Sequence, residues 1–187
     1  VDKITKHKQK LHTLNKYKFN NLITKYTSNV GPSLSEIVKQ DGFYNKIYSG
    51  RARKVRDMTV TINDNILTLY AEKSSSGQYE LMKFEVDDKY QRQYIKLYLE
   101  NFNEEQLEAT NEFSGSLPKK ILQIKIPDYN KYNVIRKVVN EWNKLQNEIN
   151  DLKEQIEKTD QKIDQMVYEL YNLTEEEIKI VEDSLSQ

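Results

Sequence analysis

The densest group of chemically capable side chains is a run of cations between residues 46 and 56. Its members are Lys46, Arg51, Arg53, Lys54 and Arg56, with Tyr48 among them. Arginine presents a planar fork of donors that matches a phosphate group and the edge of guanine. A tyrosine ring can stack on a base or pack on a sugar. We therefore expect these six residues to contact DNA. The alternative is a solvated loop whose charges keep a strand edge from pairing.

The other polar groups do not suggest a second centre of chemistry. His7 and His12 lie five residues apart, so a helix would not place them on one face to hold a metal ion. Thr174 precedes three glutamates, which we interpret as a helix cap with acids in the first turn. No nucleophile–base motif, glycine-rich cofactor loop or phosphate-binding loop is recognisable. We therefore expect a chain that is not itself catalytic and that carries neither cofactor nor metal.

A net charge of zero conceals a strong charge asymmetry along the chain. Residues 1–56 contain 13 Lys and Arg against three Asp and Glu, whereas residues 57–130 and 131–187 each contain eight against 13. Such an asymmetry indicates either a polyanion contact at the basic end or docking of that end against an acidic partner. The acidic helix predicted below supplies such a partner inside the same chain, so both interpretations stay open at this point.

Composition limits the class of protein. A length of 187 residues suits one ordinary domain, or one domain with an extended arm. The charged fraction of 31% exceeds the usual ~25%, which favours a modest core with a large solvated surface. The absence of cysteine excludes disulfides and thiolate metal sites and fits a reducing compartment, so we expect a cytoplasmic protein.

Targeting signals and chain ends lead to two further expectations. No apolar run approaches the ~20 residues that span a bilayer, and no signal-peptide pattern opens the chain, so we expect no membrane partner. The first residue is Val1 rather than Met, so we expect the chain to be a fragment of a larger protein.

Hydrophobic periodicity predicts an α+β fold, a small antiparallel sheet with helices plus long coiled-coil-type helices. A basic amphipathic helix is expected over 3–28, and a capping box at Ser33 and Glu36 should start a short helix that ends near Gly42. The elements expected next are a loop or strand over 43–56, strands over 58–62, 66–72, 79–86 and 121–126, a turn at 63–65, a helix over 87–102 and a polar stretch to residue 116.

Apolar residues recur in three-four steps from Ile135 to Leu170, which predicts one long helix with a paired face. Packing against the N-terminal helix would form a hairpin. Ile149 followed by Leu152 is also the pattern that parallel two-stranded coils favour, so a homodimer through the 135–170 helix is the competing arrangement. We divide the chain into a small α+β module over 1–130 and, over 131–187, the long helix with a short capped helix after it.

The end of this helix carries a resemblance to a known family. Ile163-Asp-Gln-Met-Val-Tyr-Glu-Leu-Tyr-Asn-Leu-Thr-Glu-Glu-Glu-Ile-Lys-Ile-Val-Glu182 resembles the C-terminal phrase IDxxVYxLYGLTEEE. That phrase is typical of N6-adenine DNA methyltransferases and type IIG restriction enzymes with a TaqI-like specificity region. Residues 117–127 resemble the strand that commonly precedes the long helix in that family. The family's glycine is Asn172 here, the next-best residue for a left-handed backbone position.

The resemblance implies a non-catalytic DNA target-recognition and helical docking module of a restriction–modification enzyme. The parent protein would be a site-specific DNA adenine-N6 methyltransferase or a fused restriction endonuclease, with S-adenosylmethionine bound outside this chain. Its partners would be double-stranded DNA and the methyltransferase or nuclease domain, in the same protein or in another subunit. The alternative is a coiled-coil structural or protein-interaction adaptor without DNA contact.

Overall fold

The computed structural model describes residues 2–40, 44–46, 48, 50, 52–72 and 77–185. The chain forms two compact units. One comprises Lys18–Asn143, and the other combines Val1–Tyr17 with Lys144–Gln187. This division differs from the predicted boundary at residue 130, because the first 17 residues group with the C-terminal part of the chain. The expected α+β class with a long helix is confirmed.

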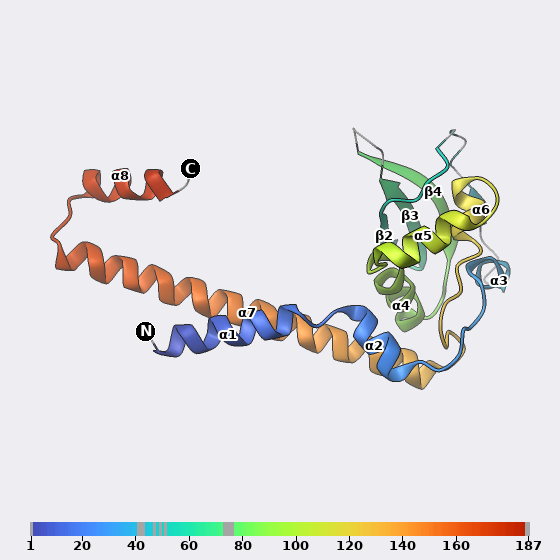
Figure 1. The fold of residues 1–187 in the computed structure, drawn as a ribbon, viewed down its shortest axis with the longest axis horizontal. Helices are drawn as coiled ribbons and strands as arrows, with labels where there is room; N and C mark the ends of the chain where they lie inside the picture. The colour runs from blue at the N-terminus through green and yellow to red at the C-terminus, as the bar shows by residue number, and fades with distance from the viewer. Residues whose placement is uncertain are drawn as a thin grey trace. The chain divides into compact units, whose positions relative to one another are not determined.

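A four-stranded antiparallel sheet lies in the unit Lys18–Asn143 (Figure 1). Its strands are β1 (Tyr44–Lys46), β2 (Met58–Asn63), β3 (Ile66–Glu72) and β4 (Gln78–Glu85), in the order β1-β4-β3-β2. β2 and β3 form the predicted hairpin, with Asp64 in the left-handed region at φ 54°. A register shift between Leu69 and Tyr70 lets both Leu81 and Met82 of β4 reach the core.

The helix α4 (Lys89–Glu100) satisfies the outer edge of β2. Asp88 caps the helix, accepting hydrogen bonds from the backbone N–H groups of Tyr90 and Gln91. The N–H of Val60 donates to Glu100 Oε1 over 2.8 Å, and Lys96 Nζ donates to the carbonyl of Val60 over 2.5 Å. These bonds occupy backbone groups that an edge strand would otherwise offer to another chain.

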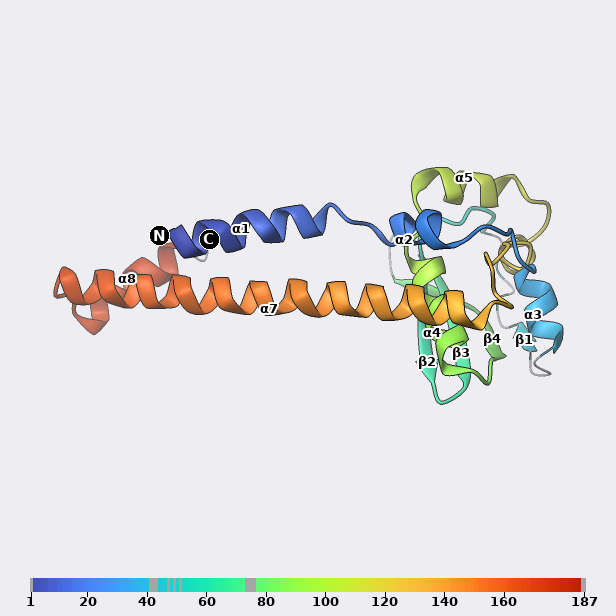
Figure 2. The same cartoon turned by 90° about the horizontal axis from the view of Figure 1, so that it is seen from below.

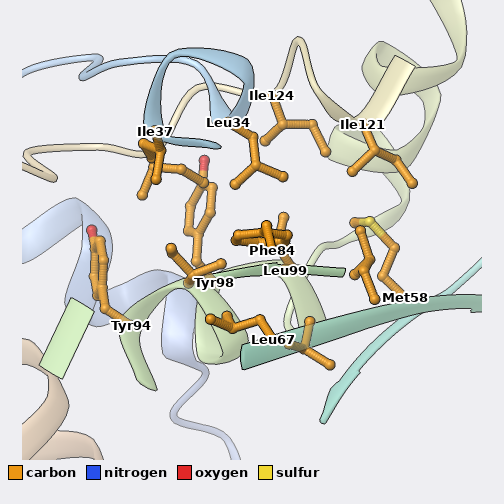
Figure 3. Packing of buried hydrophobic residues seen from close by; sticks show 14 of the residues in the cluster. Leu34, Ile37, Met58, Leu67, Phe84, Tyr94, Tyr98, Leu99, Ile121 and Ile124 are labelled. Atoms are coloured by element: carbon orange, nitrogen blue, oxygen red, sulfur yellow. The ribbon is translucent and has the colours of Figure 1, made fainter. Parts of the chain in front are cut away.

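The core lies between the sheet, α4 and two further short helices, and Figure 3 shows part of its side-chain packing. Leu67 and Phe84 supply it from the strands, and Tyr94 and Leu99 from α4. α3 (Leu34–Gln40) and α6 (Leu117–Ile121) complete it with Leu34, Ile37 and Ile121. Tyr94 and Tyr98 of α4 are buried in this core. Burial raises the pKa of the Tyr94 hydroxyl, which donates to the carbonyl of Pro127 over 2.9 Å.

A buried carboxylate fixes the crossing of two chain segments in this unit. Asp128 is 3% exposed and accepts from the N–H of Ser28 over 2.8 Å and from the Asn29 amide over 2.6 Å. Lys131 Nζ lies 3.0 Å away. Burial alone would raise the Asp128 pKa, but these donors outweigh it and lower the pKa to about 2. Gly31 is required beside it, since a Cβ there would lie 1.8 Å from the Ile126 carbonyl oxygen.

The unit formed by the two chain ends is helical (Figure 2). The long helix α7 (Tyr132–Leu170) begins in the other unit. α1 (Asp2–Asn15) lies along the C-terminal part of α7. α8 (Glu175–Leu185) follows α7 after a tight turn. Ile4 of α1 and Ile149 and Leu152 of α7 are buried. Within the described residues, no helix combines the length and apolar character that a bilayer span requires.

The helix predicted over 3–28 is interrupted, and this expectation is corrected. The N-terminal part is α1, and α2 (Phe19–Tyr26) begins anew after Lys16 and Tyr17. The Asn21 side chain accepts from the Lys18 N–H over 2.7 Å and thereby caps the new helix. A cap of this kind stabilises a helix start at this point and so favours a new helix over continuation of α1.

The fourth strand predicted over 121–126 is also wrong. Residues Leu117–Ile121 form α6, with Pro118 in the first turn, where a missing N–H costs nothing. A turn at Leu122 and Gln123 follows α6, and Lys125 then pairs outside the sheet, through an isolated antiparallel bridge to Ser33. Alternating burial of Ile124 and Ile126 therefore reflects packing against residues 32–35 rather than a place in the sheet.

Candidate nucleic-acid interface

Residues 52–57 run from the region of β1 to the start of β2 and form an extended segment, which we call the basic loop. Arg53, Lys54 and Arg56 are exposed, whereas Val55 between them is 2% exposed. Val55 anchors the segment in the core, and the cations on either side of it lie in solvent. The loop therefore presents three of the predicted cations to solvent.

Tyr48 anchors the start of the basic loop. Its hydroxyl accepts from the N–H of Ala52 over 2.7 Å, and its own N–H donates to the Leu81 carbonyl over 3.2 Å. Its ring meets that of Tyr79 edge-on, with 5.2 Å between the ring centroids. A Cβ at Gly50 would lie 2.5 Å from the Tyr48 hydroxyl, so this position leaves no room for a side chain unless the ring moves. Tyr48 is buried, and it holds the loop rather than facing a ligand.

Asn111 of α5 (Glu104–Glu112) clamps the middle of the loop. Its Oδ1 accepts from the Val55 N–H over 2.7 Å, and its Nδ2 donates to the Val55 carbonyl over 2.8 Å. Both backbone groups of Val55 are thus satisfied by one side chain, as in a strand pair. The ammonium of Lys120, which is buried, donates in turn to the carbonyl of Asn111. The far end of the loop is held where the Glu72 N–H donates to the Asp57 carbonyl over 3.3 Å.

The sequence did not predict the pair of hydrogen bonds between Asn111 and Val55. Residues 103–116 were expected to be a polar stretch, but Asn103 caps α5 and exchanges bonds with Gln106, three positions on. That capping box was the available signal for the helix. The role of Asn111 had no local signal, because its partner is 56 residues away.

The surroundings of the basic-loop cations favour an anionic ligand. Within the described ranges of the chain, no acidic side chain lies within ion-pair distance of Arg53, Lys54 or Arg56. The three side chains line a depression of about 230 Å³ together with Ala52, Glu72 and Tyr79. A concentration of positive charge beside a concave surface attracts anions.

Two of the predicted contact residues cannot be placed. Arg51 lies outside the described residues, and for Lys46 only the backbone, in β1, is described. Of the six residues, the structure therefore brings Arg53, Lys54 and Arg56 together on the surface and buries Tyr48 beneath them.

Several other basic residues of the N-terminal segment have acidic partners within their own units. Lys8 Nζ lies 3.3 Å from Asp160, and Lys10 Nζ lies 2.6 Å from Glu148, both on α7. Lys25 Nζ lies 3.7 Å from Glu141, whose carboxylate also accepts from the Tyr26 hydroxyl over 2.7 Å. The internal charge matching that the sequence left open is thus present for these lysines.

The C-terminal phrase forms a capped helix–turn–helix. Asn172 adopts a left-handed conformation at φ 50°, and the Leu173 N–H donates to the Tyr168 carbonyl over 3.0 Å. Thr174 and Glu177 exchange the hydrogen bonds of a capping box, which lowers the Glu177 pKa. The predicted left-handed asparagine and helix cap are confirmed. In the part of the chain that the structure describes, no three His, Asp or Glu side chains gather as a metal site would require.

Comparisons with models of protein families, with curated proteins and with solved structures found no match to this chain.

Proposed function

We propose that this chain is a non-catalytic DNA target-recognition and helical docking module of a restriction–modification enzyme. The observation that carries the proposal is the basic loop, an anchored segment whose Arg53, Lys54 and Arg56 have no acidic partner among the described residues. The C-terminal phrase over 163–182 supports the choice of enzyme class through its resemblance. In this proposal the parent enzyme is a DNA adenine-N6 methyltransferase or a fused restriction endonuclease, which binds S-adenosylmethionine in another domain.

The physical basis of binding is electrostatic positioning followed by base contact. Each lysine or arginine that neutralises a phosphate releases counterions, so the logarithm of affinity falls linearly with the logarithm of salt concentration. Phosphate contacts set the register on the duplex, and side chains at base edges then select the sequence. Anchoring by Tyr48 and Asn111 reduces the entropy that the loop would lose on binding.

The test is a titration of a fluorescent duplex with the full chain at a series of salt concentrations. We expect affinity to fall steeply as salt rises. Replacing Arg51, Arg53, Lys54 and Arg56 together by alanine should flatten the slope by about 0.9 for every phosphate that the chain no longer neutralises. Circular dichroism and thermal melting should confirm that the variant is folded. Absence of binding at low salt would refute the proposal for this chain.

A coiled-coil adaptor is the second candidate, and a specific surface favours it. Ile163, Met166 and Leu170 at the end of α7 are exposed, with Leu170 at 75%. They continue the three-four stripe whose earlier members, Ile149 and Leu152, are buried within the same unit. A stripe of this kind is typical of a helix that pairs with another helix.

Sedimentation separates a homodimer through α7 from an intramolecular hairpin. If the chain dimerises through α7, Ile156→Lys and Leu170→Lys should each lower the observed mass from dimer to monomer. A wild-type chain that sediments as a monomer over the accessible concentration range would exclude the homodimer.

A further inference from the structure

The depression beside the basic loop contains a carboxylate among its cations. Glu72 is exposed at the end of β3 and lines the depression with Arg53, Lys54 and Arg56. Its backbone is tied to the loop by the bond to the Asp57 carbonyl. The floor includes Tyr79, which is half-buried against Tyr48.

Glu72 is not placed as a neutralising partner for these cations. Across the described residues, no Lys or Arg lies within ion-pair distance of its carboxylate, although three cations line the same depression. For binding to phosphate alone, a carboxylate at this place is unfavourable, because it repels the anion that the cations attract. The mixture of charges therefore suits a ligand that offers donors as well as acceptors.

The edge of a base pair is such a ligand. In the major groove, guanine offers only the acceptors N7 and O6, while cytosine and adenine carry amino groups that donate. A carboxylate can only accept, and its usual partner on DNA is the N4 amino group of cytosine. The cations beside it can hold the neighbouring phosphates. The depression has a volume of about 230 Å³, and groups of both charge signs line it.

We propose that this depression reads one base of the DNA target and that Glu72 determines specificity by accepting a hydrogen bond from an exocyclic amino group. This inference rests on the proposed DNA-binding function and assigns the residues different tasks. Arg53, Lys54 and Arg56 supply affinity for any sequence, and Glu72 supplies preference at one position at some cost in affinity.

The test is selection of binding sites from a duplex library with a randomised centre, using the wild-type chain, Glu72→Ala, Glu72→Gln and the control Glu108→Gln. Glu108 is an exposed carboxylate on α5 of the same unit. We expect the wild type and the control to enrich the same motif. Glu72→Ala should lose the preference at one position that carries cytosine or adenine, with discrimination falling by about 5-fold to 150-fold. Its affinity for a random duplex should stay unchanged or rise, because a negative charge is removed.

The possible failures are distinguishable. If the wild type binds DNA with a steep salt dependence but both Glu72 variants keep its motif, the specificity role is refuted and the DNA-binding function stands. If the wild type binds but enriches no motif, the same conclusion follows. If it binds no DNA at all, both proposals fall. Equal loss of affinity for every sequence in Glu72→Ala would make Glu72 a structural residue and would also refute its role in reading.

Discussion

The lysines of α1 and the cations of the basic loop belong to one basic segment of the sequence, but their surroundings differ. Lys8 and Lys10 face Asp160 and Glu148 of α7 in the helical unit. Arg53 and Arg56 face no described carboxylate at ion-pair distance and line a depression in the sheet-containing unit. A count of charges along a chain therefore does not locate a polyanion site, whereas the partners of each charge do.

The two regions also differ in what holds them. In the helical unit, α1 and α7 are held together by a short row of buried apolar side chains. The ion pairs between the two helices are exposed and contribute little to stability. The basic loop is held by hydrogen bonds to buried or half-buried side chains, Tyr48 and Asn111. Four substitutions test what holds each unit, beginning with the largest expected effect.

Ile149→Lys should separate α1 from α7. Ile149 is 5% exposed, and a lysine there would bury a charge without a partner in place of an apolar contact. We expect a cost on the order of 3–5 kcal/mol to the docking of α1, seen as fast amide exchange across α1. Gln155→Lys, at an exposed position of α7, is the matched control. Unchanged amide exchange in α1 would show that the buried Ile149 does not hold α1 on α7.

Asp128→Asn should lower the stability of the sheet-containing unit and remove part of its pH dependence. The folded pKa of about 2 lies below the ordinary value of 3.8, so the carboxylate stabilises fully above pH 3.8 and the contribution is lost as pH falls towards 2. Asparagine tolerates the φ of 49° but weakens the bonds to Ser28 and Lys131. We expect a loss of about 1–3 kcal/mol at neutral pH.

Urea unfolding at several pH values measures this effect. The wild type should lose stability on acidification more steeply than Asp128→Asn. The control Glu108→Gln, which removes an exposed carboxylate, should follow the wild type. Parallel profiles for the wild type and Asp128→Asn would contradict the assigned role.

Asn111→Ala should release the middle of the basic loop. Both backbone groups of Val55 lose their partner, at a cost of about 1–2 kcal/mol. Hydrogen exchange at the Val55 amide should accelerate, and affinity for a duplex should fall several-fold because the loop must be ordered on binding. Asn111→Asp keeps the acceptor for the Val55 N–H and should protect that amide better than alanine does. Equal exchange in all three proteins would show that the clamp is dispensable.

Asn172→Ala should have the smallest effect, confined to the helical unit. Alanine in the left-handed region costs about 1 kcal/mol, whereas Asn172→Gly should be neutral or slightly stabilising. Thermal melting of the two variants decides the point. A glycine variant as destabilised as the alanine variant would indicate that the asparagine side chain, rather than its backbone conformation, matters there.

Local patterns predicted most of the elements correctly, because their signals are contained in a few neighbouring residues. The hairpin at Asp64, the cap at Asp88 and the long α7 each follow from a turn, a cap or a stripe. The pattern over 121–126 misled because alternating burial arises in any extended segment packed on one side, inside a sheet or outside it. The break between α1 and α2 depended on one side chain, Asn21, capping the new helix.

The candidate site was predictable in its residue types and only partly in its arrangement. The cluster of Arg53, Lys54 and Arg56 was visible from spacing, and the structure exposes all three. The burial of Tyr48 and the approach of Asn111 and Glu72 are consequences of tertiary packing, which brings segments up to 56 residues apart onto one loop. No local pattern encodes such contacts.

The central claim is that the cations of the basic loop bind DNA and that the ion-paired cations of α1 do not. Two variants with the same change in net charge test it directly, Arg53→Ala with Arg56→Ala and Lys8→Ala with Lys10→Ala. Duplex affinity is measured against salt for both variants and for the wild type. We expect the loop variant to lose affinity and its log–log salt slope to fall by about 2, whereas the α1 variant should stay close to the wild type. Equal weakening by both variants, or a larger loss in the α1 variant, would contradict it.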